Sequence, residues 1–225
     1  MKKFDLQDDP VRQLNQFLHH ESSADTAIEV TNPGGKHNVA AGAMHNTQID
    51  IRGHVGYYCA GMNQHASVTI HGNAGPGLAE NIMSGSVRVK GNASQYCGAT
   101  AHGGLLVIEG NAAARCGISM KGVDIVVGGS IGHMSAFMAQ SGRLVVCGDA
   151  GDSLGDSIYE ARIYLRGKAA SLGTDCIEKP MEQTHKDELA ILLADAGLDH
   201  DPEEFRRYGS ARQLYNFKID NVSAY

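Results

Sequence analysis

Seven glycines recur at intervals of 19 residues through the middle of the chain. They are Gly53, Gly72, Gly91, Gly110, Gly129, Gly148 and Gly167. The residues four and two positions before each glycine are Ile, Val or Leu in all fourteen cases. Aliphatic residues at period two, closed by glycine, indicate a short strand whose two aliphatic side chains face a core. The repeat therefore predicts a solenoid of about seven coils, each with at least one strand.

The length of the repeat separates two kinds of solenoid. Nineteen residues are enough for one short strand and several tight turns, which is typical of one coil of a parallel β-helix. A leucine-rich repeat is the alternative, because Val68, Ile70 and Asn73 match the core of its signature. The leucine expected three residues before the first aliphatic position is replaced by residues such as His65 and Ser84. We therefore expect a mainly β fold: a single-stranded parallel β-helix of about seven 19-residue coils, with short terminal α-helices.

Glycine usage also divides the chain into segments. Of its 28 glycines, 26 lie between Gly34 and Gly173. We expect an N-terminal capping helix segment over residues 1–27, the β-helix over 28–177, and a C-terminal helical segment and tail over 178–225. Gly34 falls in register with the repeat, but Asn32 interrupts the aliphatic pattern. This combination predicts a degenerate first coil of the kind that caps solenoids.

Two further positions of the repeat predict how each coil turns and packs. Asn or Asp follows the glycine in four repeats, which suits a tight corner that tolerates left-handed backbone. These residues are Asn73, Asn92, Asn111 and Asp149. Three of the five cysteines share one column with two leucines, so we expect them to be buried as small apolar residues. The column contains Cys59, Leu78, Cys97, Cys116 and Leu154.

The two ends of the chain predict helices. Asp9 and Pro10 suit the N-cap and first position of a helix whose apolar face would close the rod. That face consists of Val11, Leu14, Phe17 and Leu18. A second helix contains Leu189, Leu192 and Leu193 and is expected to end at Gly197. A short helix is expected to begin at Asp201 and Pro202, and residues 214–219 alternate as an extended strand would.

One row of the repeat points away from the core and changes character along the chain. Alternate residues of a strand face opposite sides, so the position three before each glycine faces outward. The row is polar at Asp50, Thr69 and Arg88 and then apolar at the next four positions, Val107, Val126, Val145 and Tyr164. An apolar ladder outside the core indicates a cover, supplied either by the chain's own tail or by a partner. These four residues are therefore the candidate interface.

Net charge, targeting signals and cysteine spacing limit the partners, the location and the metal or disulfide chemistry that this chain can have. Lys and Arg number 19 against 25 Asp and Glu, a formal net charge of −6, which argues against nucleic acid or a membrane surface as partner. The first residues lack the apolar core of a signal peptide, and no stretch has the roughly 20 apolar residues of a membrane span. We expect a cytoplasmic protein. The five cysteines contain no C-x-x-C pair, which argues against a disulfide framework or a local metal motif.

The sequence offers little for catalysis. It contains no phosphate-binding loop, no zinc-protease motif and no nucleophile elbow. His54, His71, His102 and His133 fall in different columns of the repeat, so stacking does not gather them as metal ligands. An acidic group of Asp152, Asp156 and Glu160 is better explained as solvated surface than as the site of a pectin-cleaving enzyme. We expect no catalytic, cofactor-binding or metal-binding residue in this chain.

The repeat resembles a known family. Ile/Val-x-Ile/Val-x-Gly-Asn-Ala coils with further glycines, such as Gly56, Gly75 and Gly132, are similar to the glycine-motif β-helix that ends the large chain of glutamate synthase. The similarity spans most of residues 30–175. It continues into residues 205–212, which look like the H-x-x-x-T-G-S-x-x-A segment after that β-helix, with Tyr208 in place of Thr. As a separate chain with a Tyr-Asn-Phe-Lys tail, it is most similar to the β-helix subunits of N-methylglutamate synthases (methylamine–glutamate N-methyltransferases).

The resemblance implies a division of labour between subunits. An amidotransferase-like subunit and an FMN-binding synthase-like subunit, the latter a candidate for an iron–sulfur cluster as well, would carry the reactive groups. The β-helix would be a non-catalytic scaffold between them, in a complex that converts methylamine and glutamate into N-methylglutamate and ammonia. A stand-alone enzyme, the β-helix subunit of formylmethanofuran dehydrogenase and another glutamate-synthase-like subunit remain alternatives.

Overall fold

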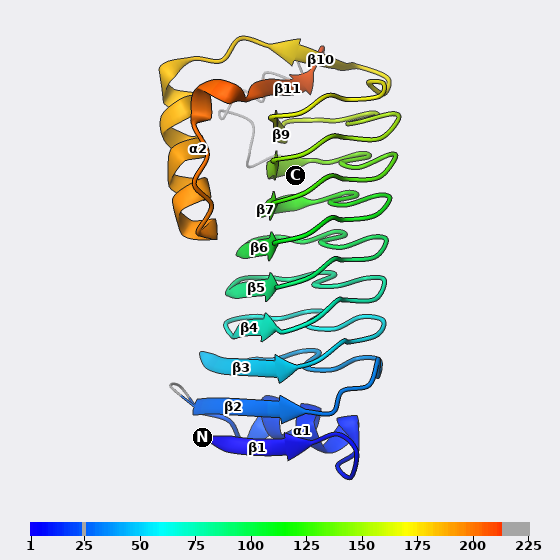
Figure 1. Ribbon diagram of the computed structural model, residues 1–225, viewed down its shortest axis with the longest axis vertical. Helices are drawn as coiled ribbons and strands as arrows, with labels where there is room; N and C mark the ends of the chain where they lie inside the picture. The colour runs from blue at the N-terminus through cyan, green and yellow to red at the C-terminus, as the bar shows by residue number, and fades with distance from the viewer. Residues whose placement is uncertain (24–25, 213–225) are drawn as a thin grey trace, which may run out of the picture.

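The computed structural model describes residues 1–23 and 26–212. It shows a rod of stacked coils, with one helix at the N-terminal end and a second helix alongside the other half (Figure 1). The strands stack one per coil along the rod. Their bounds are β1 Lys2–Asp5, β2 Thr26–Thr31, β3 Thr47–Arg52, β4 Ser67–Ile70, β5 Ser86–Val89, β6 Leu105–Ile108, β7 Lys121–Val127, β8 Ser141–Val146, β9 Arg162–Leu165, β10 Cys176–Lys179 and β11 Arg206–Ser210.

The described strands form one 11-stranded sheet in the order β1-β2-β3-β4-β5-β6-β7-β8-β9-β11-β10. Pairing is parallel from β1 to β9, and β11 is antiparallel to both of its neighbours. From β3 to β9 the coils stay in the predicted register, as in the row Ile49, Val68, Val87. The expected parallel β-helix is confirmed, and the leucine-rich repeat is wrong.

The coil from β2 to β3 is longer than the 19 residues that the spacing of Gly34 and Gly53 suggested. Ile28 pairs with Ile49 and Val30 with Ile51, an offset of 21 residues, so the ladder partner of Gly53 is Asn32 and not Gly34. Placing Gly34 in the glycine column was therefore wrong. The coil from β2 to β3 is therefore two residues longer than the later coils, and its aliphatic pair is Ile28 and Val30.

The core follows the repeat closely. Both aliphatic residues of every predicted strand are buried, and so are Cys59, Cys97 and Cys116, which confirms that these thiols pack as apolar residues. A second parallel ladder of single bridges runs along the corner after the glycines. It joins Val55, Ala74, Ala93, Ala112, Ile131, Ala150 and Ala169. Five of these seven residues are alanines, and Val55 and Ile131 are the larger exceptions.

The glycine column is required by contact between coils. Of the seven glycines only Gly53 has a positive φ, +143°. A β-carbon at Gly72 would lie 2.7 Å from the carbonyl carbon and oxygen of Gly53 in the coil below, closer than such atoms approach. The corner therefore demands a residue without a side chain, although six of the seven glycines do not have a left-handed φ.

The asparagines after these glycines act through their side chains and not through left-handed backbone. Oδ1 of Asn73 accepts the backbone N–H of Asn92 at 2.8 Å, and Oδ1 of Asn92 accepts that of Asn111 at the same distance. Asn111 and Asp149 accept in the same way from Ser130 and Lys168. The expected left-handed corner at these residues is wrong, because none of them has a positive φ.

Left-handed backbone occurs instead on the turn side of each coil, at residues of varied type. Tyr58, Ala60 and Met62 have φ of 59°, 53° and 56°. Their N–H groups donate alternately to the coil above and the coil below: Tyr58 to the Pro76 oxygen, Ala60 to the Val39 oxygen, and Met62 to the Glu80 oxygen. Hydrogen bonds in both directions offset the cost of this conformation.

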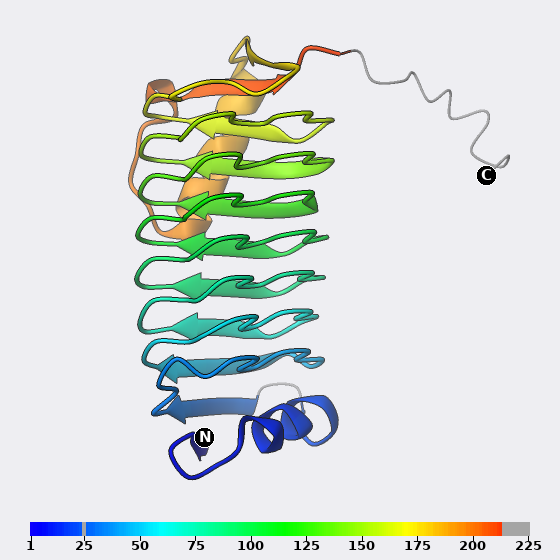
Figure 2. The ribbon, with the colours of Figure 1, turned by 90° about the vertical axis from the view of Figure 1, so that its right-hand side faces the viewer.

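Helix α1, Val11–His20, covers the N-terminal end of the rod (Figure 2). It buries Leu14, Phe17 and Leu18 as expected, but its N-cap is Pro10 and not Asp9. The Asp9 carboxylate is engaged elsewhere, because it accepts the backbone N–H of Asp5 at 2.9 Å. Strand β1, which the sequence did not indicate, extends the sheet beyond β2.

Helix α2, Gln183–Ala196, ends at Gly197 as expected, with a left-handed φ of 67°. The short helix expected at Asp201 and Pro202 is a 3-10 turn, Pro202–Glu204, in which Asp201 caps the N–H of Glu203. The extended segment expected at residues 214–219 lies outside the described residues.

Candidate docking surfaces

The outer face of the sheet consists of two halves that differ in what lies over them. Strands β6 to β9 carry the apolar part of the outward row and face helix α2, whereas β3 to β5 carry the polar part and have no helix over them (Figure 1). The boundary lies between Arg88 and Val107. The pattern of the row therefore matches the position of the helix.

The apolar half is covered by the chain itself. Val107, Val126, Val145 and Tyr164 are at most 2% exposed and form one cluster with the apolar side of α2. The α2 side of this cluster contains Leu189, Leu192, Leu193 and Ala196. The expected cover exists and is supplied by α2. As a candidate partner interface these four residues are not accessible, because the chain's own helix buries them.

Hydrogen bonds from two residues of β9 to Glu188 hold one edge of α2 against the sheet. Tyr164 donates its hydroxyl hydrogen to Glu188 Oε1 at 2.5 Å, and Arg162 donates to Glu188 Oε2 at 2.7 Å. Burial alone would raise the pKa of Glu188, but the bonds from Tyr164 and Arg162 outweigh it and lower that pKa below its ordinary 4.5. Burial, and then the bond to Glu188, raise the pKa of Tyr164. The carboxylate on the helix is thus held ionised against the sheet.

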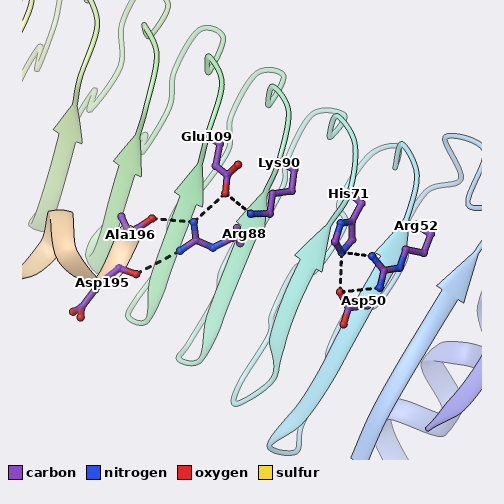
Figure 3. Close-up of polar contacts among 8 residues, drawn as sticks. All are labelled: Asp50, Arg52, His71, Arg88, Lys90, Glu109, Asp195 and Ala196. Carbon is purple, nitrogen blue, oxygen red and sulfur yellow. Dashed lines mark hydrogen bonds and ion pairs between the residues drawn. The ribbon is translucent and has the colours of Figure 1, made fainter. Parts of the chain in front are cut away.

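Arg88 fixes the other end of α2 (Figure 3). Its Nη1 donates to the carbonyl oxygen of Ala196 at 2.9 Å and to Glu109 Oε1 at 3.2 Å, and its Nη2 reaches the Asp195 oxygen at 3.4 Å. The last carbonyls of a helix lack partners within the helix and carry partial negative charge, so a guanidinium there is favourable. Lys90 completes the group with a bond of 2.7 Å to the same Glu109 oxygen.

The open half carries a second polar group on neighbouring coils (Figure 3). His71 Nε2 lies 2.8 Å from Asp50 Oδ1 and 2.9 Å from Arg52 Nη1. One ring nitrogen cannot accept from the guanidinium and donate to the carboxylate at the same time. As an acceptor this nitrogen bonds the Arg52 guanidinium and as a donor it bonds the Asp50 carboxylate, so the two hydrogen bonds are alternatives. The sequence indicated a polar row at Asp50 but not this group, which needs residues from neighbouring coils.

The other candidate residues lie apart from one another. The seven corner glycines form one line along the rod. Their role is structural, because each allows the corner to contact the coil below. Asp152 accepts a hydrogen bond from Ser171, and Asp156 accepts from Ser157 and Thr174, so these acidic residues bond to their own coils and neighbouring turns. Within residues 1–23 and 26–212, no three His, Cys, Asp or Glu side chains lie close enough together to hold a metal ion.

The cysteines are buried, and burial also makes their thiols unreactive. Burial raises the pKa of Cys59 to about 12, and burial also raises those of Cys147 and Cys176 to about 11. A thiol is a nucleophile or metal ligand only as its thiolate, which burial disfavours here. Neither α-helix described by the structure is long and apolar enough to cross a membrane.

Comparison with known proteins gives one full-length relative. The chain is 61% identical to Protein GlxC of Rhizobium meliloti (strain 1021) over an alignment of 228 residues that covers 100% of both chains. No protein-family model matches the chain. No solved structure matches it either.

Proposed function

Because the chain belongs to the GlxC family, we propose that its members are non-catalytic scaffold subunits of a glutamate-synthase-like complex. The observation that carries this proposal is the parallel pairing of β3 to β9, which keeps one register apart from a single shift between Lys121 and Asp124 and in which backbone and side chains alike serve contacts between coils. A rod bonded in this way at every coil keeps its length and shape, so it can hold two partners at a fixed separation.

Repeated polar side chains support the same role. Asparagine side chains can bind ligands in other proteins, but here Asn73, Asn92 and Asn111 each accept an N–H from the next coil. The buried thiols and the bonded carboxylates are likewise committed to the rod. These side chains therefore serve contacts between coils, which supports a scaffold role.

The resemblance in the sequence supports a finer assignment. N-methylglutamate synthase forms N-methylglutamate and ammonia from methylamine and glutamate. In this assignment an amidotransferase-like subunit and an FMN-binding subunit, with an iron–sulfur cluster as a further candidate group, carry the chemistry, and the present chain joins them in the cytoplasm. The methyltransferase-type activity then belongs to the whole complex.

Affinity purification from the native host grown on methylamine tests this proposal. We expect the tagged chain to recover a flavin-bearing chain and an amidotransferase-like chain, identified by mass spectrometry, together with N-methylglutamate formation. Recovery with both chains but without that activity would retain the scaffold and contradict the finer assignment. Recovery alone, or with a tungsten- or molybdenum-containing dehydrogenase, would contradict the proposed function.

A further inference from the structure

Basic side chains gather around one hollow at the end of the rod opposite α1, where β9, β11 and β10 lie next to one another (Figure 1). The cavity has a volume of about 170 Å³ and is lined by Arg162, Lys179, Arg207 and Arg212. We call it the basic hollow. One carboxylate, that of Glu160, also belongs to its lining. In a chain whose net charge is −6, the sign of the charge is reversed at this place.

Two of the four cations already have a carboxylate partner. Arg162 donates at 2.7 Å to the carboxylate of α2 described above, and Arg212 Nη2 lies 2.5 Å from Asp175 Oδ2. Within the part of the chain that the structure describes, neither Lys179 nor Arg207 forms an ion pair. These two charges are therefore the ones that a bound anion would neutralise.

Lys179 and Arg207 lie directly opposite each other. They are Cα partners in the antiparallel pairing of β10 with β11, and Arg207 is also the partner of the outward-facing Tyr164. Directly opposite residues share one face of a sheet, where like charges destabilise the pairing. Nε of Arg207 donates to the Pro180 oxygen at 2.9 Å, a contact that brings no negative charge. An anion between the two side chains would offset their repulsion.

A glycine keeps the hollow open. Gly209 belongs to the lining, and a β-carbon there would lie 3.8 Å from both the Ala161 oxygen and Lys179 Cγ, which is ordinary contact. Its φ is not left-handed. The corner glycines differ, because a β-carbon at those positions would collide with the coil below. A side chain at position 209 would therefore fit, and it would fill the hollow.

Ser210 adds a buried hydroxyl to the lining. It is 8% exposed, and its Oγ accepts the N–H of Arg212 at 3.2 Å. Among residues 1–23 and 26–212, the hydroxyl hydrogen has no acceptor. The lining thus offers donors from three strands. A phosphate group accepts at three or more oxygens and carries up to two charges, whereas a carboxylate has two oxygens and one charge, so the phosphate group suits these donors better.

His185 of α2 lies in the same positive field. Burial first, and then the charge of Arg207, lower the pKa of His185 below its ordinary 6.5, and Arg162 acts in the same direction. Glu182 and Glu188 act in the opposite direction but do not reverse the shift. The carboxylates of the helix therefore leave part of the positive charge uncompensated.

We propose that the basic hollow binds a phosphate group, either of inorganic phosphate or of a small phosphorylated molecule. Its volume of about 170 Å³ is below the roughly 300–1,000 Å³ of pockets that enclose drug-sized ligands, so it holds the charged group and not a whole nucleotide. The proposal is independent of the scaffold role, because it concerns binding by this chain alone.

Isothermal titration calorimetry of the full chain tests the proposal, at constant ionic strength and about pH 8, where phosphate groups carry close to two charges. Inorganic phosphate, glycerol phosphate and acetate are titrated separately. Lys179→Gln and Arg207→Gln each remove one charge from the hollow, and Gly209→Val fills it without changing its charge. Arg206→Gln is the matched control, because Arg206 is the neighbouring residue of β11 and lies outside the lining.

We expect the wild type to bind one of the two phosphate compounds clearly more tightly than acetate, and the tighter compound identifies the source of the group. Lys179→Gln, Arg207→Gln and Gly209→Val should each weaken binding by about tenfold or more at unchanged circular dichroism, as the loss of a charge-assisted hydrogen bond does. Arg206→Gln should bind as the wild type does. Absence of phosphate binding, equal binding of acetate, or an equal loss with Arg206→Gln would overturn the proposal.

Two further measurements on the full chain locate the anion. The pKa of His185, followed by NMR, should rise when phosphate binds, because the anion offsets the charge of Arg207. An unchanged pKa of His185 at saturating phosphate would overturn the proposal. Asp220 is the one acidic side chain beyond residue 212, and Asp220→Asn should bind phosphate as the wild type does. Markedly tighter binding would mean that the chain's own carboxylate occupies the hollow, which would also overturn it.

Discussion

At Gly110, a β-carbon would lie 2.5 Å from Asn92 Oδ1 and 2.8 Å from the Gly91 carbonyl oxygen. The same environment recurs at most glycines of the column, because each lies against the backbone of the coil below. Coils of a parallel sheet are spaced at about 4.8 Å, which leaves no room for a methyl group where the corners are in contact. Residue choice here follows from the distance between coils.

Replacement of Gly110 by Ala tests this steric explanation. The methyl group would force the corner apart, and we expect a loss of about 3 kcal/mol in the free energy of unfolding. Gly35→Ala is the control, because Gly35 has a φ of +73° but open space around its β-position. Its cost should be about 1 kcal/mol, from backbone angle alone. Urea unfolding measures both, and a larger loss at Gly35 would contradict the explanation.

The asparagine line gives a second prediction at this scale. Asn92→Ala removes the acceptor for the N–H of Asn111 and should cost about 1 kcal/mol in unfolding free energy. Asn92→Asp keeps the acceptor, as Asp149 does naturally towards Lys168, and should cost clearly less. Thermal unfolding compares the two variants. Equal losses would show that the side-chain hydrogen bond does not stabilise the coil.

At the scale of elements, helix α2 and the sheet form a second small core outside the solenoid. Val126 is fully buried in it, and Glu188 holds the edge through Tyr164 and Arg162. Arg88 holds the far end of the helix. The cluster is separate from the interior of the rod, so α2 can be perturbed without disturbing the coils beneath it.

Val126→Asp should release α2. A carboxylate buried there without a partner costs several kcal/mol, which the helix avoids by leaving the sheet. Limited proteolysis should then cut within residues 183–196, while the coils remain resistant. Thr69→Asp changes the same row on the open half, where it should alter neither protection nor folding. Unchanged protection of α2 in Val126→Asp would contradict the packing described here.

The pH dependence of α2 follows from Glu188. Its pKa is lowered in the folded chain, so its contribution to docking is present above pH 4.5, the ordinary value, and is lost as the pH falls through the lower folded value. The protection factors of the α2 amides, which compare exchange with the intrinsic rate at the same pH, should therefore decrease as the pH falls below about 4.5. Glu188→Gln should weaken docking at neutral pH and flatten this dependence. Asp187→Asn, whose carboxylate bonds Gln183 on the same helix, is the control.

The sequence predicted most strands but not everything around them. Strands β3 to β9 were visible because two aliphatic residues and a glycine mark each coil. The 21-residue first coil escaped because Gly34 happens to fall 19 residues before Gly53. Left-handed backbone at residues as different as Tyr58 and Met62 carries no signal in residue type, since hydrogen bonds between coils impose it.

The docking surfaces were less predictable than the fold. The apolar row from Val107 to Tyr164 correctly indicated a cover, but the identity of that cover depends on how α2 returns along the rod. The grouping of Asp50, Arg52 and His71 depends on the stacking of neighbouring coils. Such contacts become visible only once the chain is folded.

Over the whole molecule, distinct surfaces occupy different parts of a rigid rod. Helix α1 covers one end of the rod, α2 covers the outer face of β6 to β9, and no helix lies over β3 to β5 (Figures 1 and 2). Adjacent coils are about 4.8 Å apart, so surfaces several coils apart can contact different partners without competing. This arrangement is the structural basis of the proposed scaffold.

The central claim is that this chain joins two other subunits, and sedimentation of the three purified chains tests it most directly. The amidotransferase-like and FMN-binding chains should sediment separately when mixed with each other, and all three should sediment as one species once this chain is added. Full association of the two partner chains in its absence, with no change on adding it, would contradict the scaffold role.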